Sequence, residues 1–404
     1  MSVPKLRFPG FTGEWEEKPL SFAIASLDAG VSVNSGEGLA SDGESGVLKT
    51  SCVTLGVFDP TENKIVDQVS ELKRLKEQVK AGTIIISRMN TPALVGANAY
   101  VSKNSPNLFL PDRLWAAKIK QTASSRWIAL LLGHSGTRRA LSDRATGTSG
   151  SMKNLTKSDV LTLPIFLPIL HEQQKIAAFL GAVDAKLAAL ASRQVALGRF
   201  KAGLMQKLFS QQLRFTRDDG QAFPDWQEIE LRAVSIINPK SPKLPNRFRY
   251  IDLESVNAGT LGAVGEIDAT EAPSRAQRVL QRGDILYQMV RPYQRNNLYF
   301  DLDGVYVGST GYAQIRARQN RQYLFHVLHT DEFVNRVLER CTGTGYPAIN
   351  SNDLGKVTVP FPHPDEQQKI ANALSAMDAK IQAVTDQATK LQTFKKGLLQ
   401  QLFV

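Results

Sequence analysis

Two short segments hold the residues of this chain that are best suited to read nucleic acid. One is Ser87-Arg88-Met89-Asn90-Thr91-Pro92, and the other is Gln288-Met289-Val290-Arg291-Pro292-Tyr293-Gln294-Arg295-Asn296-Asn297. An arginine side chain can donate two hydrogen bonds to guanine, and asparagine or glutamine can bond adenine in the same two-pronged way. Proline stiffens both segments. DNA contact is the hypothesis for these residues, and a solvated polar loop is the alternative for each.

A second pair of segments has residues suited to the phosphate backbone. Residues 144–148 read Arg-Ala-Thr-Gly-Thr, and residues 340–344 read Arg-Cys-Thr-Gly-Thr. Their backbone amides are candidates for phosphate binding, although tight turns are the favoured alternative. The candidate DNA-contacting residues of the whole chain are Arg88, Asn90, Arg144, Lys153, Asn154, Arg291, Tyr293, Gln294, Arg295, Asn296, Tyr346 and Asn350.

The charge of the chain favours a polyanionic partner. The formal net charge is +11 at pH 7. Residues 211–365 contain 18 basic and 18 acidic side chains, yet 15 of the basic ones are arginine, which suits bidentate contacts. Nucleic acid is the commonest partner of such a protein. Solubility or a basic proteome is the alternative explanation.

The motifs of the common enzyme classes are missing. The sequence has no Walker A loop and no complete dinucleotide fingerprint, and the helix start at His171-Glu172 lacks the second histidine of a zinc protease. Cys52 and Cys341 have no metal-ligand spacing and fit a reducing compartment. No secretory leader or membrane-spanning run is found. We therefore expect a non-catalytic, cytoplasmic protein that binds no metal or cofactor itself.

Repetition shows which elements must position the candidate residues. Residues 172–210 and 366–404 are 194 positions apart and identical at roughly half of their positions without a gap. Residues 81–86 recur as 282–287, which predicts a buried strand before each reading segment. An amphipathic helix is expected at about 127–143 and again at 322–339. Residues 30–80 have no clear counterpart in 240–282, so we expect a shared frame with divergent inserts.

The two repeated segments near residues 172–210 and 366–404 are typical of long coiled-coil helices. Their apolar residues follow 3–4 spacing over about five heptads. At 1.5 Å per residue, each helix would measure roughly 58 Å, more than the roughly 34 Å turn of DNA, so it is long enough to act as a ruler. An ordinary bundle core is the alternative. The stripe consists of Ile176, Leu180, Val183, Leu187, Leu190, Leu197, Leu204, Ile370, Leu374, Met377, Ile381, Val384, Leu391 and Leu398.

These elements predict an α+β fold with a pseudo-two-fold internal repeat. Two α/β globules are separated by two long helices that pack as an antiparallel coiled coil. The predicted segments are a first globule at 1–171, a first helix at 172–210, a second globule at 211–365 and a second helix at 366–404.

The chain resembles the specificity subunits of type I restriction–modification systems. The motifs are the opening Pro-Lys-Leu-Arg-Phe at residues 4–8, Gly-Asp-Ile-Leu at 283–286, and Pro-x-x-x-Glu-Gln-Gln-Lys-Ile from Pro168 and from Pro362. A Phe-Lys-x-Gly-Leu-x-Gln-x-Leu-Phe pattern closes both helices, from Phe200 and from Phe394. The first half departs from Gly-Asp-Ile-Leu with Thr83 and Ile85. The resemblance covers essentially the whole chain.

This resemblance implies a DNA-recognition subunit. Each globule would read one half of an asymmetric, bipartite DNA site, and the helical spacers would set the gap between the halves. Two methyltransferase subunits would dock on the repeat, and restriction subunits would join them. S-adenosylmethionine, Mg²⁺ and ATP would be used by those partners. A stand-alone two-headed DNA-binding regulator is the alternative, and a coiled-coil scaffold that does not bind DNA is a third hypothesis.

Overall fold

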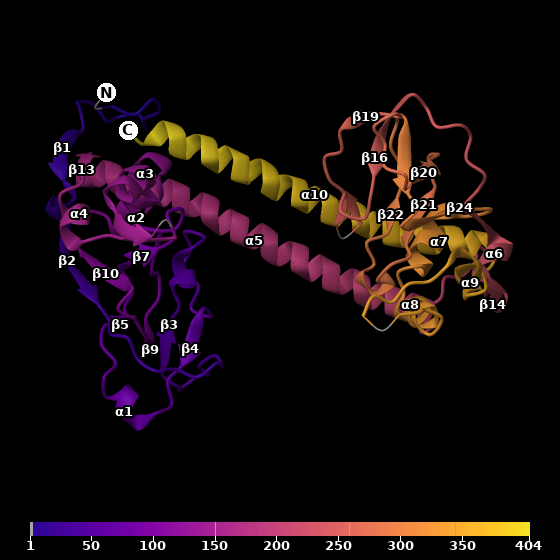
Figure 1. Ribbon diagram of the computed structural model, residues 1–404, viewed down its shortest axis with the longest axis horizontal. Helices are drawn as coiled ribbons and strands as arrows, with labels where there is room; N and C mark the ends of the chain where they lie inside the picture. The colour runs from indigo at the N-terminus through magenta and orange to yellow at the C-terminus, as the bar shows by residue number, and fades with distance from the viewer. Residues whose placement is uncertain (1–2, 150, 258, 344) are drawn as a thin grey trace. The chain divides into compact units, whose positions relative to one another are not determined.

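The computed structural model describes residues 3–149, 151–257, 259–343 and 345–404 (Figure 1). The chain divides into two compact units. Unit 1 is Met1–Ala189 with Gln387–Val404, and unit 2 is Leu190–Asp386. Each unit therefore contains one globule, the first half of one long helix and the second half of the other.

Unit 1 is built on a central four-stranded sheet in the order β2-β10-β6-β8. Strand β6 is buried on both faces: Ile84 and Ile86 enter one core with Trp127, while Ile85 enters a second core with Leu110. This alternation follows from the two-residue period of a strand. The expected buried strand is thus confirmed. The strands of this sheet are β2 (Ile24–Ala29), β6 (Ile84–Ser87), β8 (Asn98–Tyr100) and β10 (Leu114–Ile119).

Smaller sheets and helices complete unit 1. A second four-stranded sheet has the order β4-β3-β9-β5, with β3 and β9 parallel. Strand β1 pairs with β13, and β7 pairs with β12, which also pairs with β11. The bounds are β1 (Glu16–Pro19), η1 (Leu20–Phe22), β3 (Gly46–Leu48), η2 (Thr50–Val53), β4 (Asn63–Ile65), α1 (Val69–Leu72), β5 (Gln78–Val79), β7 (Met89–Asn90), β9 (Ser105–Phe109), α2 (Ser125–Gly133), α3 (Ser135–Arg144), β11 (Thr146–Ser149), β12 (Met152–Asn154), α4 (Lys157–Leu161) and β13 (Pro164–Leu167).

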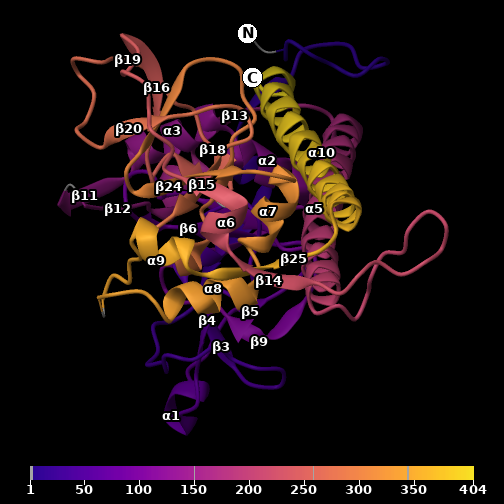
Figure 2. The same ribbon diagram turned by 90° about the vertical axis from the view of Figure 1, so that its right-hand side faces the viewer.

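Unit 2 repeats this plan, with a central sheet in the order β15-β24-β21-β22 and a second sheet in the order β19-β16-β23-β20. Helix α7 follows β24 and lies against it (Figure 2). The bounds are β14 (Gln227–Glu230), α6 (Leu231–Val234), β15 (Ser235–Ile237), β16 (Arg247–Ile251), β17 (Val256–Asn257), β18 (Thr260–Leu261), β19 (Glu266–Asp268), β20 (Ala276–Val279), β21 (Ile285–Gln288), η3 (Pro292–Gln294), β22 (Leu298–Tyr299), β23 (Tyr306–Ser309), β24 (Tyr312–Ala317), α7 (Arg321–Val327), α8 (Asp331–Leu338), α9 (Ser351–Gly355) and β25 (Thr358–Phe361).

The segments that we expected to be unrelated inserts share one topology. Taken in chain order, β3, β4, β5 and β9 correspond to β16, β19, β20 and β23, with the same sheet order and the same single parallel pair. The expectation of divergent inserts at 30–80 and 240–282 is therefore wrong at the level of the fold. Short strands with little sequence in common can keep a topology because pairing is made by the backbone.

Each expected amphipathic helix is in fact a pair of helices. In unit 1 the break falls at His134, whose backbone is extended between α2 and α3. In unit 2 the side chain of Thr330 accepts a hydrogen bond from Phe333 N at 3.3 Å and so caps a new helix, α8. The apolar spacing continued across both breaks, which is why the pattern alone predicted one helix.

The two long helices pack through the predicted stripe. Helix α5 spans Leu170–Phe209 and α10 spans Pro364–Leu402. Unit 1 joins the first half of α5 to the second half of α10, and unit 2 joins the remaining halves. All fourteen stripe residues named above are buried or half-buried.

Polar contacts between the helices show that the packing is antiparallel. In unit 1, Asp184 Oδ1 lies 2.5 Å from Lys395 Nζ. In unit 2, Asp378 Oδ1 lies 2.5 Å from Lys201 Nζ. Also within unit 2, Gln194 Nε2 donates to Thr385 Oγ1 at 2.9 Å, so the residue number on α10 falls by 7, from 385 to 378, as the residue number on α5 rises by 7, from 194 to 201. Asp378 and Lys395 are also the repeat equivalents of Asp184 and Lys201, so each unit carries one copy of the same contact.

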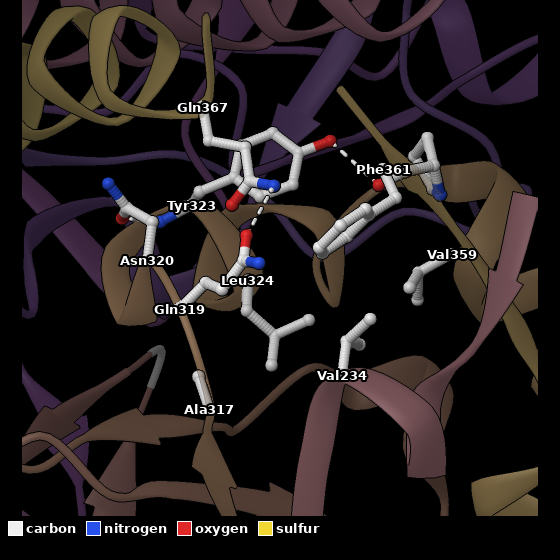
Figure 3. Close-up of a pocket in the computed structure, with 10 residues that line it drawn as sticks. Val234, Ala317, Gln319, Asn320, Tyr323, Leu324, Val359, Phe361 and Gln367 are labelled. Atoms are coloured by element: carbon white, nitrogen blue, oxygen red, sulfur yellow. Dashed lines mark hydrogen bonds between the residues drawn. The ribbon is translucent and has the colours of Figure 1, made fainter. Parts of the chain in front are cut away.

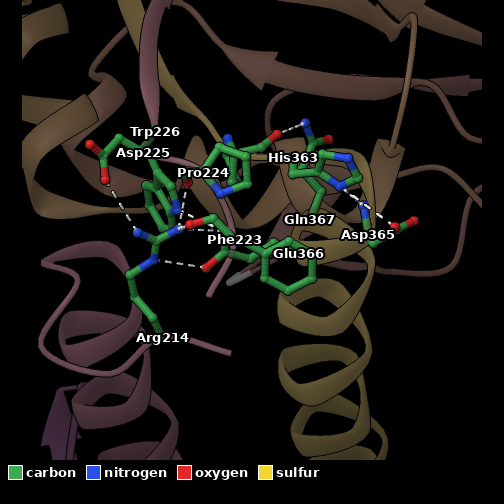
Figure 4. A network of polar contacts seen from close by, with 10 residues as sticks. Arg214, Phe223, Pro224, Asp225, Trp226, His363, Asp365, Glu366 and Gln367 are labelled. Atoms are coloured by element: carbon green, nitrogen blue, oxygen red, sulfur yellow. Dashed lines mark hydrogen bonds and ion pairs between the residues drawn. The ribbon is translucent and has the colours of Figure 1, made fainter. Parts of the chain in front are cut away.

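A buried ion pair anchors the start of each long helix. In unit 1, Arg7 donates two hydrogen bonds to the Glu172 carboxylate, at 2.7 and 2.8 Å. In unit 2, Arg214 donates to Glu366 at 3.1 and 2.9 Å, and Trp226 Nε1 donates to the same carboxylate at 2.9 Å (Figure 4). Both carboxylates are buried, so these donors offset their desolvation. The repeated Leu-Arg-Phe and Glu-Gln-Gln motifs are therefore two sides of one contact.

The glutamine after each glutamate ties the helix to the preceding strand. Gln173 Nε2 donates to the Pro168 carbonyl at 2.8 Å, and Gln367 Nε2 donates to the Pro362 carbonyl at 3.0 Å. Figure 3 shows Gln367 pointing toward Gln319 as well, where the amide groups lie 3.4 Å apart. These bonds explain the spacing of the Pro-x-x-x-Glu-Gln-Gln motif.

Candidate nucleic-acid interface

The two reading segments begin at equivalent places after β6 and β21. The Arg88 carbonyl accepts a hydrogen bond from Leu155 N at 2.8 Å. The Met289 carbonyl accepts the same bond from Ile349 N at 3.0 Å. Arg88 and Met289 therefore hold one position in the two units.

Three further positions of the two units can be aligned by counting residues from the equivalent bonds of Arg88 and Met289. We call these three positions the reading tip of each unit. In unit 1, Asn90 and Lys153 are paired across β7 and β12. In unit 2, Arg291 N donates to Pro347 O at 2.7 Å, which joins the same two segments. The aligned pairs are Asn90 with Arg291, Met152 with Tyr346, and Lys153 with Pro347.

The tip of unit 1 is partly engaged with its own chain. Asn90 Nδ2 donates to Ser87 Oγ at 3.2 Å, and Asn90 Oδ1 accepts from Thr91 N at 2.9 Å. Lys153 Nζ donates to the Ser142 carbonyl at 2.7 Å. One amide hydrogen of Asn90 is not needed by the Ser87 bond, so this side chain keeps limited capacity for a ligand.

The other candidates of unit 1 differ in how far the protein uses them. Arg144 Nη1 donates to the Asp159 carbonyl at 3.2 Å and to Thr162 Oγ1 at 3.0 Å. Arg88 lies with its guanidinium 5.8 Å from the ring centroid of Trp115. Its buried Nε atom has no hydrogen-bond partner among the described residues, and neither has Asn154 Oδ1.

The tip of unit 2 is an arginine stacked on an exposed ring. The Arg291 guanidinium lies 4.2 Å from the ring centroid of Tyr346. Tyr346 is 65% exposed and nearby Tyr293 is 49% exposed. The accessible Tyr346 ring and the cation stacked on it form a surface that suits a planar, electron-rich ligand.

Three other candidates of unit 2 stabilise the fold. Arg295 donates to the His329 carbonyl at 3.1 Å and to the Asp331 carboxylate. Gln294 Oε1 accepts from Gln288 Nε2 at 2.9 Å. Asn350 caps α9, because its side chain accepts from the Asp353 backbone nitrogen at 2.9 Å. Their contact with DNA stays a prediction, as does that of Asn296.

The backbone of this loop is held in an uncommon conformation. Arg291 and Arg295 have φ angles of 53° and 54°, on either side of the turn η3. A non-glycine residue in the left-handed region costs on the order of 1 kcal/mol or more and persists only where its surroundings impose it. Here the Arg291–Pro347 bond and the Arg295 contacts impose it.

Sequence reasoning missed the residue that shapes the loop. Gln288 is 4% exposed, and its side chain bonds to the Val290 carbonyl at 2.7 Å and accepts from Asn296 N at 3.2 Å. Asn297 Oδ1 in turn accepts from Gln288 N at 2.8 Å. A polar residue at the end of a buried strand was the available signal.

The candidate phosphate loop of unit 1 lies in a strand, and the equivalent loop of unit 2 takes part in a single isolated bridge. In unit 1, β11 pairs with β12, and a Cβ atom on Gly147 would lie 2.1 Å from the Met152 carbonyl oxygen, so the close approach requires glycine. In unit 2, Thr342 and Ala348 form an isolated bridge at the equivalent place. Thr344 lies outside the described residues.

Over the described parts of the chain, no group of three or more histidine, cysteine, aspartate and glutamate residues could hold a metal ion. None of the helices described there is both long and apolar enough to cross a membrane.

Comparison with known proteins identifies the family. The family described as "Type I restriction modification DNA specificity domain" matches residues 58–196 and 225–393, one match in each half. The chain belongs to this family of type I restriction–modification specificity subunits.

Individual relatives agree with this assignment. The MjaVIII specificity subunit of Methanocaldococcus jannaschii is 24% identical over 59% of this chain and 60% of its own length. The putative MjaX specificity subunit of the same organism is 23% identical over 87% of this chain and 85% of its own length. The HindI specificity subunit of Haemophilus influenzae is 29% identical over 40% of this chain, but the match spans only 34% of that protein.

Solved structures share the fold. The S subunit of a type I restriction–modification system from M. genitalium aligns with a TM-score of 0.65 at 17% identity, over 100% of this chain and 99% of that one. A chain from a study of complex assembly in the type I R-M system aligns with a TM-score of 0.54 at 18% identity, over 99% of both chains. The expected α+β fold with two recognition globules and long helices is therefore confirmed.

Proposed function

We propose that this chain is the DNA-recognition subunit of a type I restriction–modification complex, in which each unit reads one half of a bipartite, asymmetric site. The observation that carries the proposal is the pair of reading tips: one position in a shared frame presents Asn90 in unit 1 and Arg291 in unit 2. Asparagine and arginine favour different bases. Equivalent positions with different chemistry suit two unlike half-sites.

The long helices would set the gap between the half-sites. The proposal is supported by the ion pairs between the helices, which align α5 with α10 in the same register in both units. A heptad inserted into both helices, after Ser192 and after Asp386, keeps this register within each unit. It adds about 10 Å of helix, which corresponds to about three base pairs. We expect a gap longer by about three base pairs between unchanged half-sites.

Two copies of a methyltransferase subunit would dock on equivalent faces of the long helices. Phe200 of unit 2 is 62% exposed, and its repeat equivalent in unit 1, Phe394, is 53% exposed. Gly203 and Gly397 follow on the same faces, and an added Cβ would meet no other part of the described chain within 4 Å. A glycine inside a helix costs about 1 kcal/mol, and nothing in its own unit requires it here. A partner helix that packs closely on this face would explain why each repeat has an exposed phenylalanine followed by a glycine.

Substitution of the two phenylalanines tests the docking. Phe200→Ser and Phe394→Ser should each remove one methyltransferase subunit from the purified complex, and the double variant should remove both. Val195→Ser is the matched control, because Val195 is also exposed on α5 but has no apolar equivalent in α10. Loss of partners in the control, or retention in the double variant, would contradict this docking face.

The chemistry of the complex would reside in its partners. S-adenosylmethionine would serve the methyltransferase subunits, and Mg²⁺ and ATP would serve restriction subunits. Co-expression of this chain with its methyltransferase subunit, followed by sequencing of methylated adenines in the host DNA, tests the whole proposal. A new bipartite motif with two unlike halves is the expected result. A stand-alone regulator would instead bind DNA tightly without partners and produce no methylation.

A further inference from the structure

The arginine at the tip of unit 2 differs from several other arginines of its unit in what its guanidinium contacts. Arg295, Arg316 and Arg336 each bond to a carboxylate, of Asp331, Asp284 and Glu228 respectively. Among the described residues, no hydrogen bond or ion pair is found for the Arg291 side chain, which contacts the ring of Tyr346 instead. Its hydrogen-bond donors are therefore available to a ligand.

The stack on Tyr346 fixes how those donors are presented. At 4.2 Å the guanidinium lies closer to its ring than in the other cation–aromatic contacts of the described chain, which measure 5.1 to 5.9 Å. A guanidinium that lies against a ring keeps its N–H groups free at its edge. The ring is 65% exposed and Arg291 is half-buried, so the stack lies at the surface of the unit.

The backbone holds both partners of the stack in place. Arg291 N bonds to the carbonyl of Pro347, the residue after Tyr346, at 2.7 Å. The left-handed backbone of Arg291 and the ring of Pro292 limit the freedom of the loop. A rigid arginine loses less conformational entropy on binding than a flexible one.

We infer that the Arg291–Tyr346 stack is a guanine reader, so that the half-site contacted by unit 2 contains a G·C pair at the position under Arg291. This inference rests on the proposed function. The guanidinium edge matches the O6 and N7 acceptors that guanine presents together in the major groove. A phosphate presents similar acceptors, and the test separates the two.

The test compares the methylation motifs of hosts that express the methyltransferase subunit with wild-type or variant chains. Arg291→Lys keeps the charge but loses the two-pronged edge, so it should lower discrimination at a single G·C pair of one half-site by about 5- to 150-fold. Tyr346→Phe keeps the stack and should retain the motif, whereas Tyr346→Ser should relax the same base pair as Arg291→Lys. Arg247→Lys is the control, because Arg247 is paired with Glu266 and Asp268. Thermal melting of each purified complex confirms that the variants are folded.

The outcomes separate the inference from the proposed function. A wild-type motif whose relevant half-site lacks G·C pairs would overturn the guanine reader and leave the proposed function standing. Uniform loss of methylation at all sites by a folded Arg291→Lys complex would assign Arg291 to a phosphate and also overturn it. An unchanged motif in that variant would overturn it as well. If the wild-type chain directs no new bipartite methylation, the proposed function itself fails.

Discussion

The reading tips of the two units differ far more than the frames that hold them. Each tip follows the strand that is third in the spatial order of its central sheet, β6 in unit 1 and β21 in unit 2. The strand order of this sheet is the same in both units. Yet unit 1 presents Asn90 bonded to its own loop, and unit 2 presents Arg291 stacked on an exposed ring. If the proposed function holds, the duplicated frame fixes the position of each tip, and the specificity depends on a few side chains at its edge.

The largest expected effect concerns the anchors, which the frames share. Arg7→Met should lower the free energy of unfolding of unit 1 by about 3–5 kcal/mol, because it leaves the buried Glu172 without its bidentate partner. Arg214→Met should lower the free energy of unfolding of unit 2 by a smaller amount, because Trp226 Nε1 still donates a hydrogen bond to Glu366. Calorimetry of the two variants measures both losses. Equal losses would show that the indole contributes little.

An intermediate effect should distinguish the units by pH. Burial, with smaller effects of the nearby Lys201 and His329, lowers the pKa of His326 to about 3, while the carboxylate of Asp378 lies 4.0 Å away. In the unfolded chain, a histidine has its ordinary pKa, near 6.5. The unfolded state therefore binds more protons as the pH falls below 6.5, and stability is lost down to the folded pKa. Burial also lowers the pKa of His329, to about 4, so each of the two histidines should contribute a slope that approaches about 1.4 kcal/mol per pH unit.

Denaturant unfolding of the full chain between pH 7 and pH 4.5 measures this loss. Leu130 in unit 1 is the positional equivalent of His326 in unit 2. Each lies six residues after the N-cap of its helix, which is Ser124 for α2 and Asn320 for α7. His326→Leu should therefore remove the share of the slope that His326 contributes and leave the share of His329, whereas the exposed His363→Leu should leave the whole slope in place. A slope that His326→Leu does not change would assign the acid sensitivity to other groups.

The smallest expected effect concerns the helix glycines, whose replacement by alanine should stabilise the fold but weaken docking. Gly203→Ala and Gly397→Ala should each stabilise the free chain by about 1 kcal/mol, because alanine is the better helix former and has room. The same variants should weaken binding of the methyltransferase subunit to the corresponding unit. Thermal melting and affinity measurements on the same samples test both signs. Unchanged affinity would mean that no helix packs closely there.

The sequence predicted those features that repeat or have a regular period. The long helices, their apolar stripe and the buried strands before the reading segments follow from spacing alone. The shared topology of the second sheets did not, because strands of two to five residues carry little periodicity. The breaks at His134 and Thr330 were hidden by apolar spacing that continued across them.

At the reading tips the residue types were informative and the contacts were not. Arg291 and Arg295 are four positions apart and equally suited to DNA by type, yet one lies free of carboxylates among the described residues and the other bonds to Asp331. That difference depends on which segments the fold brings together, and Tyr346 lies 55 positions away from Arg291 in the chain. Local sequence does not contain such information.

The central claim is that each unit carries its own half of the specificity in a common frame. The most direct measurement is the methylation motif of a chain in which residues 211–365 also replace residues 4–171, co-expressed with the methyltransferase subunit. Because both recognition globules would then be identical, we predict a symmetric motif built from one of the two wild-type half-sites. Retention of the wild-type asymmetric motif by this chain would contradict the account.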